Sequence, residues 1–97
     1  MTNKKRADGD PLIRAFCRAV QERREFLKIS QEEVAHRAGL HRTYISDIER
    51  GTRNVSLKNL GRLAAALEMP VWSLIKSAEQ KAYTARADEH SKSESLN

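Results

Sequence analysis

The stretch SQEEVAHRAGLHRTYISDIERG, residues 30–51, decides the fold of this 97-residue chain. Ser30 and Glu33 have the spacing of a capping box, which predicts that a helix begins here. Gly39 can end that helix in the left-handed conformation, and Gly51 can end the helix that follows it. Two short helices joined by a tight, glycine-containing turn form a helix-turn-helix.

The flanking sequence predicts three more helices. Asp10 followed by Pro11 is a cap followed by a first helical residue, so a helix should run from about 11 to 27. Ser56 should cap a helix over about 57–67, and Pro70 should open a last helix whose end the pattern does not define. The core stripe of the helix over 57–67 should consist of Leu57, Leu60, Leu63, Ala64 and Leu67. With no strand pattern in sight, the fold class is all-α with five helices.

The domain boundaries follow from composition. Residues 1–9 contain Lys4, Lys5 and Arg6 and are expected to be a flexible basic arm. Residues 10–80 should form the single folded domain that a chain of this length allows. Residues 81–97 lack an apolar stripe and are expected to be a polar tail, tolerant of helix at its start and disordered from residue 90.

Charge favours a polyanionic partner. The net charge is +5, and residues 37–62 hold six basic against two acidic side chains, a local excess of +4. The chain has one cysteine, so it forms no internal disulfide, and a reducing cytoplasm is the expected location. No apolar run approaches the roughly 18 residues of a membrane span, and no signal-peptide core follows the N-terminus.

The outward face of the second helix of the helix-turn-helix carries side chains that can read base edges. Arg42 stands at the end that enters a major groove, where its guanidinium can grip guanine. Asp47 has three candidate roles: it can accept a hydrogen bond from the cytosine amino group, repel phosphate, or hold Arg50 or Arg42 in place. Tyr44 can pack at the turn or touch a base or sugar. The candidate base-reading residues are Arg42, Thr43, Tyr44, Ser46 and Asp47.

Two motifs carry a family resemblance that covers residues 13–80. SQEEVAHRAGL is similar to S-Q-x-x-L-A-x-x-A-G-L, and ISDIERGTRNVSLKNLGRLAAAL is similar to I-S-x-I-E-R-G-x-R-x-P-S-L-x-x-L-x-x-I-A-x-A-L. Both are typical of the Cro/C1 (xenobiotic-response-element-like) regulators, which implies a lambda-repressor-like fold of five helices. RTYISDIERGTRN further resembles the controller proteins of restriction–modification systems. Lys28 stands where the family often has a turn glycine, so a different turn is expected there.

The resemblance implies roles for individual residues. Gln31 should bond a phosphate and brace Arg42. Arg24 and Glu49 should form a partly buried structural ion pair between the first and third helices, since Arg24 lies on an inward-facing stripe and needs a partner. The phosphate-binding set is Gln31, Arg50, Arg53, Asn54, Ser56 and Lys58.

The last helix is expected to mediate a homodimer, with Val71, Trp72 and Ile75 at the centre of the interface. A small domain does not easily bury Trp72 as well as its aliphatic neighbours. The alternative is that Trp72 folds back onto the core of its own chain. A two-fold dimer would set two reading helices about 34 Å apart on double-stranded DNA and would require a near-palindromic operator.

The sequence therefore predicts a DNA-binding transcription regulator, a repressor or an activator according to where its operator lies relative to the promoter, without cofactor or small-molecule substrate. The alternative interpretation is an antitoxin-like protein-interaction module on the same fold, with residues 81–97 as the candidate segment that neutralises a partner protein. An enzyme is not expected, because the three histidines and Cys17 have no recognisable metal spacing and no nucleophile or phosphate-loop motif is present.

Overall fold

A computed structural model describes residues 10–96, with side chains described as far as residue 85. The basic arm expected over residues 1–9 lies outside the described residues. Within them the chain forms five helices and no strand, as the sequence predicts. The helices are α2 (Pro11–Leu27), α3 (Gln31–Ala38), α4 (Arg42–Arg50), α5 (Leu57–Ala66) and α6 (Val71–Leu96).

Side-chain caps set the start of three helices. Asp10 accepts from the backbone N–H of Leu12 and Ile13, and Ser56 accepts from that of Asn59. Ser30 accepts from the Glu33 N–H at 3.0 Å, which is one half of the predicted capping box. The Glu33 carboxylate instead accepts from Arg37 one turn later, at 2.9 Å.

The turn between α2 and α3 keeps a glycine-like geometry despite its lysine. Lys28 has φ 59° and ψ 40°, the left-handed conformation, and its N–H bonds the last turn of α2. The expectation of a different turn shape is therefore wrong. Gly39 and Gly51 end α3 and α4 in the same conformation, at φ 70° and 78°.

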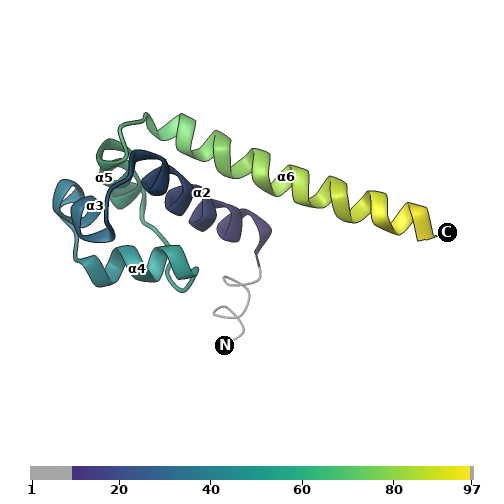
Figure 1. Ribbon diagram of the computed structural model, residues 1–97, viewed down its shortest axis with the longest axis horizontal. Coiled ribbons are helices and arrows are strands. Elements are labelled where there is room, and N and C mark those ends of the chain that lie inside the picture. The colour runs from purple at the N-terminus through teal and green to yellow at the C-terminus, as the bar shows by residue number, and fades with distance from the viewer. Residues whose placement is uncertain (1–9, 97) are drawn as a thin grey trace.

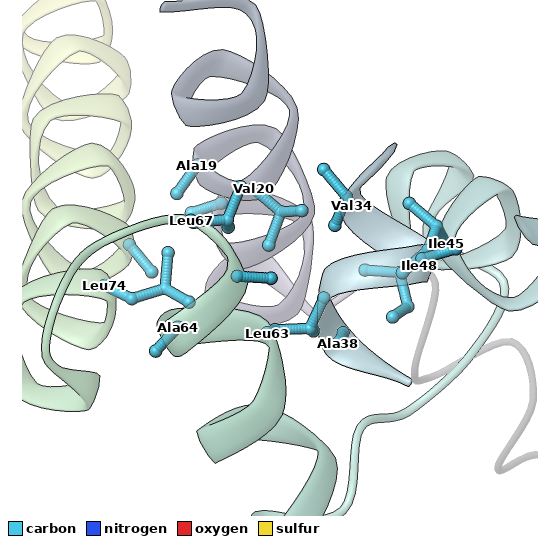
Figure 2. Packing of buried hydrophobic residues seen from close by; sticks show 14 residues of the cluster. Ala19, Val20, Val34, Ala38, Ile45, Ile48, Leu63, Ala64, Leu67 and Leu74 are labelled. Atoms are coloured by element: carbon cyan, nitrogen blue, oxygen red, sulfur yellow. The ribbon is translucent and has the colours of Figure 1, made fainter. Parts of the chain in front are cut away.

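The core is aliphatic and lies where α2 meets the other helices. Figure 2 shows Val20 of α2 between Val34 of α3 and Leu67, which follows α5. The largest fully buried side chains are Ile45, Ile48, Leu63, Leu67, Leu74, Val20 and Val34. Because these residues come from every helix, packing fixes α3 and α4 relative to α2.

One residue of the predicted core is outside it. Leu57 is 80% exposed, whereas Leu63, Ala64 and Leu67 of the same stripe are buried. Leu57 is the first residue of α5, and a helical side chain covers the surface N-terminal to its own Cα. Its side chain therefore points beyond the packed part of the stripe.

Helix α6 corrects the expected C-terminal tail. It continues without interruption through Leu96, so residues 81–96 are helical rather than a tail that is disordered from residue 90. No glycine or proline follows Pro70, and alanine, lysine, glutamate and glutamine favour helix even without an apolar stripe. Figure 1 shows α6 beside α2, with its C-terminal half extending past the rest of the domain, and α4 on the opposite side of α2.

Candidate nucleic-acid interface

A chain of side-chain contacts runs from the interior to the N-terminus of α4. Arg24 donates Nε to Glu49 Oε2 at 2.7 Å and Nη2 to Oε1 at 3.0 Å, so the predicted ion pair is present in bidentate form. Gln31 donates Nε2 to the same Oε1 at 3.0 Å, and its Oε1 accepts from Arg42 Nη1 at 3.4 Å. Gln31 therefore links the pair to Arg42, the residue it was expected to brace.

The ion pair is well shielded from water. The side chains of Arg24 and Glu49 are 15% and 5% exposed, and Arg24 also donates to the carbonyl of Ile29 at 3.0 Å. The hydrogen bond to Glu49 raises the pKa of Arg24 above its ordinary value. Arg24 is thus charged at neutral pH, and its bonds to Glu49 tie α2 to the last turn of α4.

A shallow hollow of about 520 Å³ lies over this network. It is lined by Arg24, Ser30, Gln31, Glu32 and Arg42. It opens at the N-terminal end of α3, where the backbone N–H groups favour an anion. The lining holds two arginines and one carboxylate, Glu32, so it carries a net positive charge.

Asp47 is occupied by arginines of its own chain. Its Oδ1 accepts from Arg50 Nη2 in a close contact, and its Oδ2 accepts from Arg53 Nη2 at 3.2 Å. Of the candidate roles for Asp47, the structure shows the contact with an arginine of its own chain, and this arginine is Arg50 rather than Arg42. Ser46 Oγ accepts from the same Arg50, at 3.3 Å.

Tyr44 packs within the protein. Its ring contacts the hydrophobic core, and its hydroxyl accepts a hydrogen bond from Asn59 Nδ2 at 2.9 Å. The Arg53 guanidinium lies over the face of the ring, with 4.8 Å between its Cζ and the ring centroid. Sequence reasoning missed Asn59, because a polar residue one turn into α5 gives no local sign of a partner on α4. Tyr44 and Asp47 together fix the direction of Arg53.

The remaining candidates divide by their contacts. Thr43, Asn54 and Lys58 are exposed, and Ser56 uses its hydroxyl to cap α5. Arg37, which contributed to the basic excess, bonds Glu33, Glu68 and the carbonyl of Ala66. It therefore joins α3 to the end of α5, and it does not add a free cation to the face formed by α4.

The residues predicted for the dimer interface are accessible on α6. Val71 and Trp72 are 36% and 66% exposed, so the alternative that Trp72 packs into its own core is wrong. Ile75 is half-buried and lines an apolar groove of about 270 Å³ with Leu12 and Val55, among others. Trp72 lines a different hollow, of about 630 Å³, together with Phe26 and further residues of α2 and α6.

A helix-turn-helix family, HTH_3, matches residues 20–71, which is more than half of the chain and includes α3, α4 and α5. The chain belongs to this Cro/C1-type helix-turn-helix family. Its members are DNA-binding transcription regulators and not enzymes, which agrees with the open, arginine-bearing face of α4.

Similar proteins include control proteins of restriction–modification systems. This Cro/C1-type chain is 42% identical over 73 residues to control protein C.MunI of Mycoplasma sp, covering 75% of this chain and 99% of that protein. It is 64% identical over 39 residues to control protein C.BamHI of Bacillus amyloliquefaciens, covering 40% of this chain and only 48% of the relative. In crystal form, the restriction-modification controller protein C.AhdI of Aeromonas hydrophila is 41% identical, with a TM-score of 0.61 over 65% of this chain and 94% of that one.

Within the described residues no group of three or more histidine, cysteine, aspartate or glutamate side chains is placed to hold a metal ion. None of the helices described is both long and apolar enough to cross a membrane.

Proposed function

We propose that this protein is a sequence-specific transcription regulator that binds a near-palindromic DNA operator as a homodimer, through α4 in the major groove. The observation that carries this proposal is the contact chain from Glu49 through Gln31 to Arg42. It holds a guanidinium at the N-terminal end of α4, which is the end that reads bases in this class of protein.

Phosphate contacts would flank the reading helix on both sides. Gln31 and the hollow beside it lie at one end of α4, and Arg50 and Arg53 lie at the other end. Such contacts position a protein on DNA and set its salt dependence, whereas base contacts specify the sequence. Likeness to control proteins supports a role in regulating restriction–modification genes.

The test is selection of duplexes from a random library, followed by binding measurements with Arg42→Ala. A symmetric pair of half-sites should be enriched. Loss of a bidentate arginine–guanine contact costs about 1–3 kcal/mol of discrimination at one base pair of each half-site. A matched change in a phosphate-binding residue, Lys58→Ala, should weaken all duplexes alike. If Arg42→Ala also weakens all duplexes equally, Arg42 does not read a base.

A further inference from the structure

The Asp47 carboxylate lies among the cations assigned to phosphate binding. One oxygen accepts from Arg50 and the other from Arg53. The Asp47 side chain is only 16% exposed, whereas those of Arg50 and Arg53 are 62% and 49% exposed. The two guanidinium groups therefore cover the carboxylate and present their outer sides to solvent.

Both arginines are held in place and still have donors to offer. Arg50 also donates to Ser46 Oγ, and Arg53 is stacked on the Tyr44 ring, whose hydroxyl is fixed by Asn59. A guanidinium has five N–H donors, and these contacts use one or two of them. Asp47 thus occupies one side of each guanidinium and leaves the other side for a phosphate.

We propose that Asp47 is a specificity-determining residue that acts through Arg50 and Arg53 as their internal counter-ion. This inference rests on the proposed function and extends it. Non-specific DNA binding comes almost entirely from neutralised phosphates, so a fixed carboxylate between two phosphate-binding arginines weakens binding to every sequence. Operator binding depends in addition on base contacts, which the Asp47 carboxylate does not weaken. It also depends on the orientation of Arg50 and Arg53, which the carboxylate fixes.

This role differs from base reading by Asp47 itself. Both of its oxygens already accept hydrogen bonds from guanidinium groups. A cytosine amino group would have to displace an arginine to reach either oxygen. Removal of the charge should therefore change the ratio of operator to non-specific affinity, and it should not change the preferred base at any single position.

The variant that tests this is Asp47→Asn, which keeps the size of the side chain and removes its charge. Glu79→Gln is the matched control, because Glu79 is exposed on α6 and its replacement changes the net charge equally. Binding of each protein is measured over a range of salt concentrations. The two probes are the duplex that wild-type protein selects from a random library and a scrambled duplex of the same composition.

Relative to Glu79→Gln, Asp47→Asn should raise affinity for the scrambled duplex roughly threefold to tenfold and steepen the salt slope by about 1. Operator affinity should rise less or fall, so that the specificity ratio decreases. Equal effects of the two variants overturn the proposal, because they would reflect net charge alone. A changed preference at one base pair, or weaker operator binding without stronger binding to the scrambled duplex, also overturns it.

Elution from immobilised heparin separates this inference from the proposed function. Asp47→Asn should elute at higher salt than Glu79→Gln even if no duplex is enriched, in which case the proposed function alone fails. Elution of the two variants at the same salt overturns the counter-ion role. If Asp47→Asn does not fold, as judged by circular dichroism, Asp47→Ser is measured in the same way.

Discussion

At the scale of single residues, Gln31 connects the water-shielded Arg24–Glu49 pair to the exposed Arg42 side chain. Its amide nitrogen donates to the buried Glu49, and its amide oxygen accepts from the exposed Arg42. A side-chain amide can donate through its nitrogen and accept through its oxygen at the same time. The orientation of Arg42 therefore depends on an ion pair between α2 and α4.

We expect Glu49→Gln to lower the free energy of unfolding by about 3 kcal/mol, because it leaves the Arg24 guanidinium without its charge partner in a shielded site. The urea midpoint, at unchanged slope, measures this. Glu33→Gln is the control and should shift the midpoint little, because its pair with Arg37 is only partly shielded from water, at 32% and 44% side-chain exposure. Similar small shifts for both variants would show that the Arg24–Glu49 pair adds no stability.

The pH dependence of this pair has a defined sign. The folded pKa of Arg24 is raised, so its contribution to stability is complete below the unfolded pKa and is lost only as the pH rises through the folded value. Both values lie far above neutrality. The effect of Glu49→Gln should therefore be the same at every pH near neutral.

At the scale of helices and turns, the α2–α3 connection stores strain in Lys28. A side chain in the left-handed conformation costs about 1 kcal/mol relative to glycine. The turn adopts this conformation because the Lys28 N–H caps α2 while Ile29 and Ser30 lead into α3.

Lys28→Gly should therefore raise the free energy of unfolding by at most about 0.5 kcal/mol, the left-handed cost less the extra freedom of glycine in the unfolded chain. Thermal unfolding followed by circular dichroism measures it. Lys76→Gly, in the second turn of α6, makes the same chemical change and should destabilise by about 1 kcal/mol. A loss of stability with Lys28→Gly would show that the lysine side chain itself supports the turn.

The helix ends, except the C-terminal end of α6, and the core stripes were predictable because caps and apolar spacing are local in sequence. Gly39, Gly51 and Ser30 acted as their types suggest. The exposure of Leu57 was not predictable, since a periodic stripe does not show where packing stops. The Arg53–Tyr44–Asn59 contact was missed for a related reason: it joins α4, a loop and α5, and no spacing rule connects them.

At the scale of the whole molecule, α4 and α6 lie on opposite sides of α2 (Figure 1). A dimer through the start of α6 would thus leave both copies of α4 uncovered. Large apolar side chains are exposed near that start, with Trp72 at 66% and Phe26 at 72%. Such a patch on a small domain is typical of an interaction surface.

Trp72→Glu should halve the mass measured by sedimentation, because a buried carboxylate in each half of a two-fold contact is costly. Tyr83→Glu is the control, since Tyr83 is 70% exposed about three turns further along α6 and should not affect assembly. An unchanged mass for Trp72→Glu would place the interface elsewhere. The apolar groove that includes Ile75, Leu12 and Val55 is then the next surface to alter.

The two hydrogen bonds of the Gln31 side chain also bear on how such a protein can change its DNA preference over evolution. A substitution at Arg42 alters only the exposed end of the contact chain and leaves the Arg24–Glu49 pair intact. A substitution at Gln31 removes a partner of the buried Glu49 as well, so it carries a stability cost in addition to any new preference. New operator preferences are therefore expected to arise first at Arg42, with Gln31 changing only in lineages that already carry compensating stabilisation.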